Sequence, residues 1–288
     1  MFLYTIKLFL ESFINKGKIE GELKKNKDHD ELFICATGPS AKKFLENHEI
    51  ASRKCDIIMM NDTIIFSKER VFEIKPSHYI LFDSLYFREN VKCNNQNKRS
   101  LFLQKKMHEM MECVNWPLTL IIPDWASFDI SNNNIRLEHV NTFVLKRGKI
   151  RWFLYNYNKA IPVMNNVVQV ALYYGVLKKY NKVWLIGNEY DFWKSVTVST
   201  DGNPYITYEH AFETNDLLEK WYLSEDEQCI AHGKSLVSGL LCRISETLDG
   251  YFDIAEYAQK NDTVIYNLSE GTVIDAFPIR KYESVKGD

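Results

Sequence analysis

Short, largely apolar runs recur along the chain, and each of them stops at glycine, proline or polar residues. The runs cover residues 33–36, 56–62, 78–84, 118–123, 182–187 and 262–268. Short runs of this kind are typical of parallel strands that are buried on both faces. Because helical stretches separate them, the sequence predicts an α/β fold: a single Rossmann-like, doubly wound and mainly parallel sheet.

The turn after the first run has the composition of a ligand-binding loop. Gly38 lets the backbone approach a ligand closely, Pro39 fixes its own φ angle, and Ser40 can cap the helix that begins at residue 41. Unpaired N–H groups and the positive end of the helix dipole would then face outward. This arrangement predicts an anion site for a nucleotide, and the alternative is an ordinary structural turn.

Polar residues also end the next two runs. Thr37 and Ser40 follow the first run, Asn61 ends the second, and Asp83 with Ser84 ends the third. The carboxyl ends of parallel strands meet at one edge of the sheet, and ligands of open α/β folds bind beyond that edge. We therefore expect these side chains to belong to one substrate site.

Composition narrows the classes of function. The 288 residues carry a formal net charge of −2, which provides no general attraction for nucleic acid, so we expect no nucleic-acid partner. Six scattered cysteines without a C-x-x-C pair favour a reducing cytoplasm. Asp28-His29-Asp30 resembles a metal-binding motif, but it precedes the first strand, so we predict no metal site.

The amino-terminal stretch is unusually apolar. Residues 1–14 predict an amphipathic helix, which residues 15–18 end. The helix either docks on the domain or lies on a membrane surface, and the second interpretation gives a peripheral membrane contact through residues 1–18. No run reaches the roughly 18 apolar residues that a membrane span requires. A charged connector follows, so residues 1–30 precede one domain that covers residues 31–288.

Residues 194–228 show no strand pattern but are rich in aromatic side chains, Tyr205 and Tyr208 among them. A long aromatic insertion after a sheet strand predicts a lid over the substrate rather than a second domain.

Residues 129–138 predict a loop. A helix is predicted over residues 236–248, shortly after His232.

Taken in order, the motifs resemble those of the bacterial sialyltransferases of glycosyltransferase family 42. The resemblance covers roughly residues 31–280. Alanine replaces the first glycine of the family's Gly-x-Gly-Pro-Ser loop, and Trp193 replaces a phosphate-binding tyrosine. The matching segments are residues 36–40, Asn61, Asp83-Ser84, Asn165-Asn166, residues 186–193, residues 231–234 and residues 268–272.

The resemblance implies metal-independent, inverting transfer of sialic acid from CMP-sialic acid to a galactoside of a bacterial surface glycan, such as lipopolysaccharide or capsule. It implies His232 as the base, Tyr205 and Tyr208 as phosphate ligands, and no cofactor. The implied location is the bacterial cytoplasm or the inner face of its membrane. The implied substrate contacts are Thr37, Gly38, Pro39, Ser40, Asn61, Asp83, Ser84, Asn165, Asn166, Gly187, Asn188, Asp191, Trp193, Ser269, Glu270, Gly271 and Thr272.

This chemistry suits the residue types. A histidine can accept a proton near neutral pH, and tyrosine hydroxyls can stabilise a leaving phosphate. Two alternatives stay open. The same fold could use another nucleotide sugar or transfer pyrophosphate, which usually needs Mg²⁺ or Mn²⁺, or the chain could be a non-catalytic nucleotide-binding or scaffold protein. The sequence determines neither the acceptor nor the linkage, and it leaves a homo-oligomer open.

Overall fold

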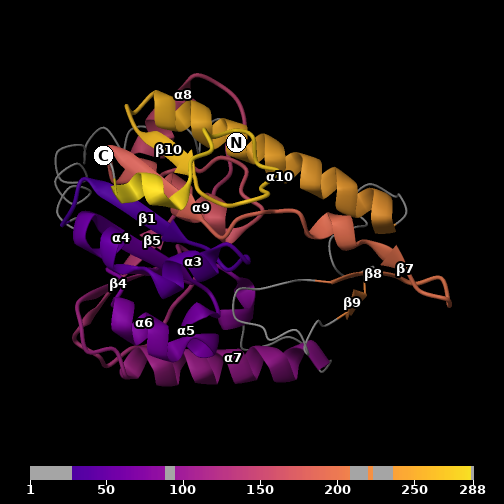
Figure 1. Cartoon of the computed structure of the whole chain (residues 1–288), viewed down its shortest axis with the longest axis horizontal. Coiled ribbons are helices and arrows are strands. Elements are labelled where there is room, and N and C mark those ends of the chain that lie inside the picture. The colour runs from indigo at the N-terminus through magenta and orange to yellow at the C-terminus, as the bar shows by residue number, and fades with distance from the viewer. Residues whose placement is uncertain (1–27, 88–94, 208–219, 223–235, 287–288) are drawn as a thin grey trace.

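The computed structural model describes residues 28–87, 95–207, 220–222 and 236–286 (Figure 1). Its centre is a seven-stranded sheet in the order β10-β6-β1-β2-β3-β4-β5, and every neighbouring pair is parallel. The predicted α/β architecture is confirmed. The strands are β1 (Glu31–Cys35), β2 (Cys55–Met60), β3 (His78–Ile80), β4 (Leu118–Pro123), β5 (Ile135–Val140), β6 (Lys182–Ile186) and β10 (Val264–Asn267).

The strand order reverses direction between β1 and β6. From β1 the chain proceeds outward through β2, β3, β4 and β5, and it then returns to place β6 on the other side of β1. The loops that leave β1 and β6 therefore turn to opposite faces of the sheet. In open α/β folds this reversal point is where ligands bind, beyond the carboxyl ends of the strands.

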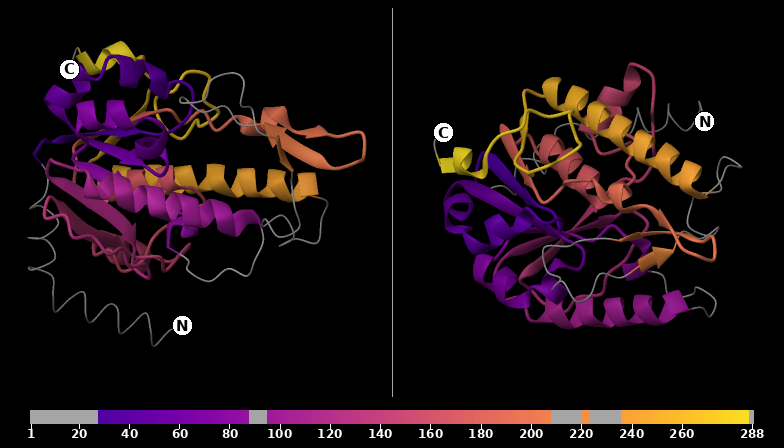
Figure 2. Two further views of the ribbon diagram at one scale, coloured as in Figure 1. Left: turned by 90° about the horizontal axis from the view of Figure 1, so that it is seen from below. Right: turned by 45° about the vertical axis from the view of Figure 1, so that its right-hand side comes forward.

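Helices cover both faces of the sheet (Figures 1 and 2). Side chains alternate along β1, so Leu32 and Ile34 join one buried cluster while Phe33 and Cys35 join the other. The first cluster includes α8 (Ile150–Asn156), α9 (Val167–Leu177) and α10 (Leu236–Gln259). The second includes α3 (Ala41–Glu46), α4 (Glu49–Lys54), α5 (Thr63–Phe66), α6 (Lys68–Ile74), α7 (Asn95–Glu112) and η5 (Tyr282–Lys286).

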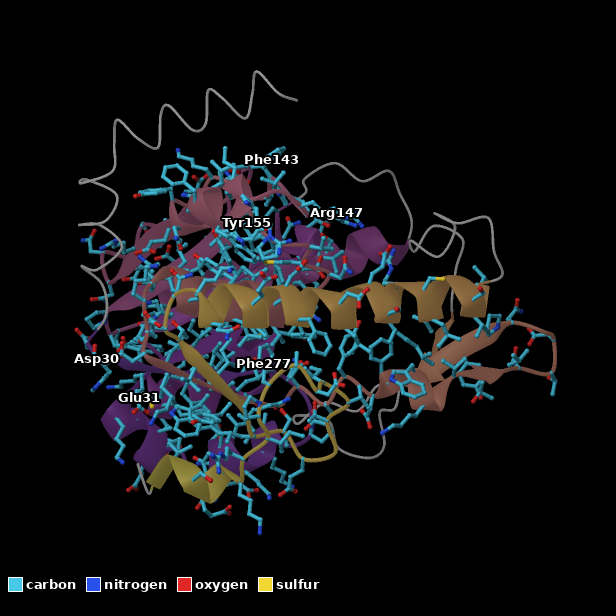
Figure 3. The ribbon with its side chains drawn as sticks, turned by 90° about the horizontal axis from the view of Figure 1, so that it is seen from above. Asp30, Glu31, Phe143, Arg147, Tyr155 and Phe277 are labelled. Carbon is cyan, nitrogen blue, oxygen red and sulfur yellow. The ribbon has the colours of Figure 1, made fainter. Side chains whose placement is uncertain are left out.

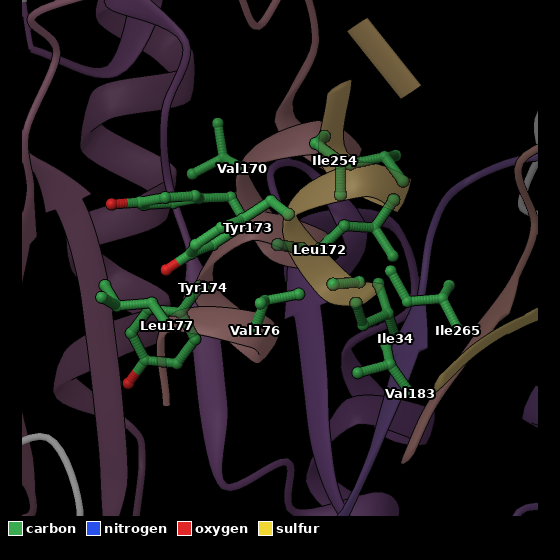
Figure 4. Close-up of a cluster of buried hydrophobic side chains, with 14 of the residues drawn as sticks. Ile34, Val170, Leu172, Tyr173, Tyr174, Val176, Leu177, Val183, Ile254 and Ile265 are labelled. Atoms are coloured by element: carbon green, nitrogen blue, oxygen red, sulfur yellow. The ribbon is translucent and has the colours of Figure 1, made fainter. Parts of the chain in front are cut away.

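Helix α9 lies in the middle of the first cluster (Figure 4). All its residues from Val168 to Leu177 are buried, as expected for a helix that is apolar on every side. Figure 3 shows Tyr155 and Phe277 on opposite sides of α10. The ring of Tyr155 lies 5.5 Å from that of Tyr257, and Phe277 lies 6.0 Å from Tyr251. Helix α10 is thus packed from both sides.

One expectation about local structure was wrong, and a predicted helix proved longer than expected. Residues 129–138 were expected to form a loop, but β5 covers most of the second half of that segment and continues to Val140. It is an edge strand whose side chains are mostly exposed or half-buried, so the apolar signal of a buried strand is absent. The helix expected over residues 236–248 continues to Gln259 in α10.

The described part of the segment expected to lack strands contains three. β7 (Thr197–Val198), β8 (Pro204–Thr207) and β9 (Lys220–Tyr222) form a small antiparallel sheet. Strands of two to four residues are too short for a periodic pattern to reveal them. Ile206 of β8 packs with Leu240 and Ile244 of α10, and Figure 1 shows α10 extending beyond the central sheet toward these strands.

Across the described ranges, we find no helix that combines the length and the apolar character needed to cross a membrane. The amino-terminal helix expected over residues 1–14 lies outside the described residues.

Candidate functional site

The loops after β1 and β6 are bonded to each other at the reversal point. Ala36 N–H donates to the carbonyl of Ile186 at 2.9 Å, and Gly38 N–H donates to the carbonyl of Gly187 at 2.8 Å. A Cβ atom at position 38 would lie 2.6 Å from the Gly187 oxygen and would overlap a carboxylate oxygen of Glu189. Position 38 therefore requires glycine because two loops approach closely there.

The carboxylate of Glu189 occupies the place where the sequence predicts an anion. Its Oε1 accepts a hydrogen bond from Ser40 N–H at 2.9 Å, at the start of α3. Glu189 is only 7% exposed, and its Oε2 is buried with no hydrogen-bond partner among the described residues. The protein's own side chain thus fills the predicted phosphate position. Sequence reasoning missed Glu189, although an acidic residue just after a buried strand was an available signal.

Ser40 has a different role from the predicted cap. Its backbone is helical, with φ −67° and ψ −16°, and its side chain caps no backbone group of α3. A capping side chain needs an extended backbone to reach the helix N–H groups. The Ser40 Oγ instead accepts a hydrogen bond from Gly187 N–H at 3.1 Å. Ser40 and Glu189 together connect the β1 loop to the β6 loop.

Asn61 ends β2 at the same edge of the sheet. Its φ is 49°, in the left-handed region that asparagine tolerates. Its backbone is held at both ends, since its N–H donates to Ile80 at 2.9 Å and its carbonyl accepts from the Tyr79 hydroxyl at 2.6 Å. The side-chain Oδ1 is buried and has no hydrogen-bond partner in the described part of the chain. Asn61 is therefore held rigidly and presents an unsatisfied acceptor.

Asp83 and Ser84 lie beyond β3 at this edge. The exposed Asp83 accepts a hydrogen bond from Leu85 N–H at 2.9 Å and so caps the short helix η1 (Ser84–Tyr86). Thr37, Gly38, Ser40, Asn61, Asp83 and Ser84 are thus distributed over the ends of three adjacent strands. The structure brings these six predicted residues to one edge of the sheet.

A second group of predicted residues meets around the hydroxyl of Tyr251 on α10. Asn166 and Asn188 donate to this hydroxyl through Nδ2, at 3.0 and 2.8 Å. Asn166 Oδ1 also accepts from Gln169 N–H at 2.9 Å and caps α9. Burial raises the pKa of Tyr251, so its hydroxyl stays neutral. The exposed Asn165 donates to Thr247 at 3.2 Å.

The segment after β10 holds the β6 loop in place. Ser269 Oγ accepts from Asn188 N–H at 2.9 Å, and Thr272 Oγ1 donates to the Asn188 carbonyl at 3.0 Å. Gly271 has a φ of 71°. Glu270 is exposed and forms an ion pair with Lys43 of α3. Ser269 and Thr272 thus position Asn188 within the protein.

The remaining predicted residues lie nearer the small sheet. Asp191 forms an ion pair with Lys194 at 3.3 Å and does not cap η2 (Phe192–Ser195). Trp193 packs against the cluster of Ile206 on β8, and its indole Nε1 is buried without a partner among the described residues. Tyr205 pairs with Tyr222 of β9. His232 and Tyr208 lie outside the described residues.

Within the described ranges, no three or more His, Cys, Asp or Glu side chains are grouped to hold a metal ion. No model of a known protein family matches the chain, and no curated protein and no solved structure matches it either. The function therefore has to be inferred from the fold and from the geometry of the site.

Proposed function

We propose that the protein is a glycosyltransferase that binds a nucleotide sugar at the carboxyl edge of its sheet, and that the donor is CMP-sialic acid. In this proposal the nucleoside lies over the junction of β1 and β6, its phosphate is directed away from the Glu189 carboxylate, and the sugar extends toward the end of β2. Support comes from the strand reversal between β1 and β6 and from the polar residues that end β1, β2, β3 and β6 at this edge.

The observation that carries the proposal is the unsatisfied Oδ1 of Asn61. A buried acceptor without a partner costs about 1–3 kcal/mol, and such a group at the ligand-binding edge of the fold suggests that a ligand satisfies it. The hydroxyl and amino groups of a nucleotide sugar are suitable donors. The family resemblance points to the CMP-activated sugar.

The proposed reaction is an inverting displacement at the anomeric carbon of the sugar. The bond from this carbon to the phosphate oxygen breaks, and CMP leaves with the bonding pair. The acceptor oxygen forms the new bond, and its proton passes to His232. Tyr205 and Tyr208 would donate hydrogen bonds to the phosphate, so the transfer would proceed without a metal ion.

Thermal unfolding in the presence of CMP, UMP and GMP tests the donor class. A ligand at about 100 times its Kd stabilises the native state by about 2.7 kcal/mol, so we expect CMP alone to raise the Tm. Stabilisation by UMP or GMP, together with loss of turnover in EDTA, would favour a different nucleotide sugar. No stabilisation by any of the three would contradict the proposal.

Asn61→Gly tests directly whether a ligand satisfies the unpaired Oδ1 of Asn61. Glycine adopts the left-handed backbone of this position without strain, and the variant loses an unpaired buried acceptor, so the unfolding free energy should not fall, while the CMP-induced shift in Tm should be lost. Lys75→Gly is the matched control, because Lys75 has a φ of 54° and precedes β3 at the opposite edge. An Asn61→Gly protein that keeps the full CMP shift would contradict the role of Asn61.

His232→Ala separates a transferase from a scaffold. We expect this variant to keep the CMP shift and to lose the release of CMP from CMP-sialic acid in the presence of lactose. A wild-type protein that binds CMP and releases none under these conditions would be a nucleotide-binding protein without this activity.

A further inference from the structure

An exposed tryptophan follows β4 at the same edge of the sheet. Trp125 is 52% exposed, and it lies in a turn closed by a hydrogen bond from Ala126 N–H to the Pro123 carbonyl at 3.0 Å. We propose that Trp125 is the platform on which the acceptor sugar stacks. This inference rests on the proposed function and adds a residue that positions the second substrate.

The indole ring of Trp125 is held in place by neighbouring aromatic rings. Its ring lies 5.7 Å from that of Phe87, at an interplanar angle of 86°. Phe87 lies 6.4 Å from Phe128, which is buried and stacks on His108 of α7 at 4.1 Å. Trp125 is therefore the exposed end of a row of packed rings. A fixed aromatic face with little freedom to lose is well suited to binding.

Two carboxylates accompany the indole. Ile80 pairs with Ile121 in the register of β3 and β4, so Asp83 and Asp124, each three residues further, follow the ends of adjacent strands at the same level. Asp83 Oδ1 accepts from Leu85 N–H at 2.9 Å, and Asp124 Oδ1 accepts from the Thr142 hydroxyl at 2.6 Å. Within the described chain the second oxygen of each has no hydrogen-bond partner.

These groups fit a neutral sugar. One face of a pyranose carries C–H groups that stack on an aromatic ring, while its hydroxyls donate to carboxylates. The two negative charges would repel a phosphate, so this end of the edge suits the acceptor better than the nucleotide. β4 lies three strand spacings, about 14 Å, from β1. The acceptor would therefore lie beyond the sugar of a donor anchored at β1 and β6.

Lactose is the probe, measured by saturation-transfer NMR and by titration of tryptophan fluorescence, with and without saturating CMP. We expect Trp125→Ala to weaken lactose binding about tenfold or more and Trp125→Phe by only about threefold, because phenylalanine keeps an aromatic face. Neither variant should change the CMP shift in Tm. Phe252→Ala is the control, since Phe252 is also an exposed aromatic residue, at 51%, and lies on α10.

The outcomes separate this inference from the proposed function. Lactose binding that is absent in the wild type, or unchanged in Trp125→Ala, would overturn the role of Trp125 even if CMP binds. Lactose binding that depends on Trp125 would support the sugar platform even if no nucleotide binds, and in that case only the proposed donor would be wrong. A urea unfolding curve of Trp125→Ala that matches the wild type excludes misfolding as the cause.

Discussion

The carboxylate of Glu189 accepts a hydrogen bond from the backbone N–H of Ser40 at 2.9 Å, across the junction of β1 and β6. This contact places a negative charge at the start of α3, where the sequence alone suggests room for a phosphate. The β1 loop is therefore organised by the protein itself before any ligand arrives. A nucleotide at this junction would find the loop already formed.

Removal of the Glu189 carboxylate should destabilise the fold. Glu189→Ala leaves the part-buried N–H of Ser40 without its acceptor, which costs up to about 1–3 kcal/mol. Glu189→Gln keeps an acceptor for this N–H and should therefore lose less unfolding free energy than Glu189→Ala. Some loss should remain, because a neutral acceptor forms a weaker hydrogen bond than a charged one. Urea unfolding measures both variants. Equal stability of Glu189→Ala and wild type would show that the contact contributes nothing.

Gly38→Ala tests the close approach of the two loops. The added methyl group would overlap Glu189 Oε2 and lie 2.6 Å from the Gly187 oxygen, and overpacking of this kind costs about 1–3 kcal/mol. In the double variant Gly38→Ala/Glu189→Ala one of the two clashes is gone, so the combined loss of unfolding free energy should be smaller than the sum of the single losses. Strict additivity would show that the methyl group does not meet the carboxylate.

Tyr251→Phe removes the hydroxyl that accepts from Asn166 and Asn188. We expect a loss of about 1–3 kcal/mol in unfolding free energy because two side-chain amides lose a partner. Tyr257→Phe is a matched control on the same helix, where one hydroxyl contact, to Asn156 at 3.0 Å, is removed. Urea unfolding of the two variants should show the larger loss for Tyr251→Phe. The reverse order would contradict a central role for the Tyr251 hydroxyl.

The ion pair of Glu138 and Lys178 predicts a dependence of stability on pH. Burial alone would raise the pKa of Glu138, but the Lys178 ammonium at 2.8 Å and the Tyr174 hydroxyl at 2.9 Å hold this pKa below its usual value of 4.5. A lowered pKa in the folded state means that the ionised carboxylate stabilises the fold above pH 4.5. This contribution is lost as the pH falls through the folded-state pKa.

Glu138→Gln should therefore cost about 3 kcal/mol at pH 7, because it leaves the buried Lys178 charge without its partner. The difference from the wild type should stay constant down to about pH 5 and then shrink as the wild-type carboxylate is protonated. Urea unfolding between pH 3 and pH 7 measures this difference. Glu109→Gln, which breaks an exposed pair with Lys106, should change the unfolding midpoint little at any pH. If the difference in unfolding free energy between Glu138→Gln and the wild type did not narrow below pH 4.5, the lowered pKa of Glu138 would be contradicted.

The sequence predicted the central strands because each is apolar along its whole length, as Phe33 to Ala36 are. It missed β5 because Arg136, Leu137 and His139 are exposed on this edge strand, so no continuous apolar run marks it. The candidate site was predicted residue by residue at strand ends, but its internal contacts were not. Ser40 and Glu189 are in contact only because β6 lies next to β1. No local sequence pattern predicts which distant strand will pair with β1.

The adjacency of β1 and β6 also determines when this junction can form during synthesis on the ribosome. The bond between Ser40 and Glu189 closes a separation of 149 residues, so the nascent chain completes the junction only after nearly two thirds of it has been made. Contacts this distant in sequence are formed slowly. A fragment that ends before β6 would carry about half of the predicted substrate residues and still have no junction in which to assemble them.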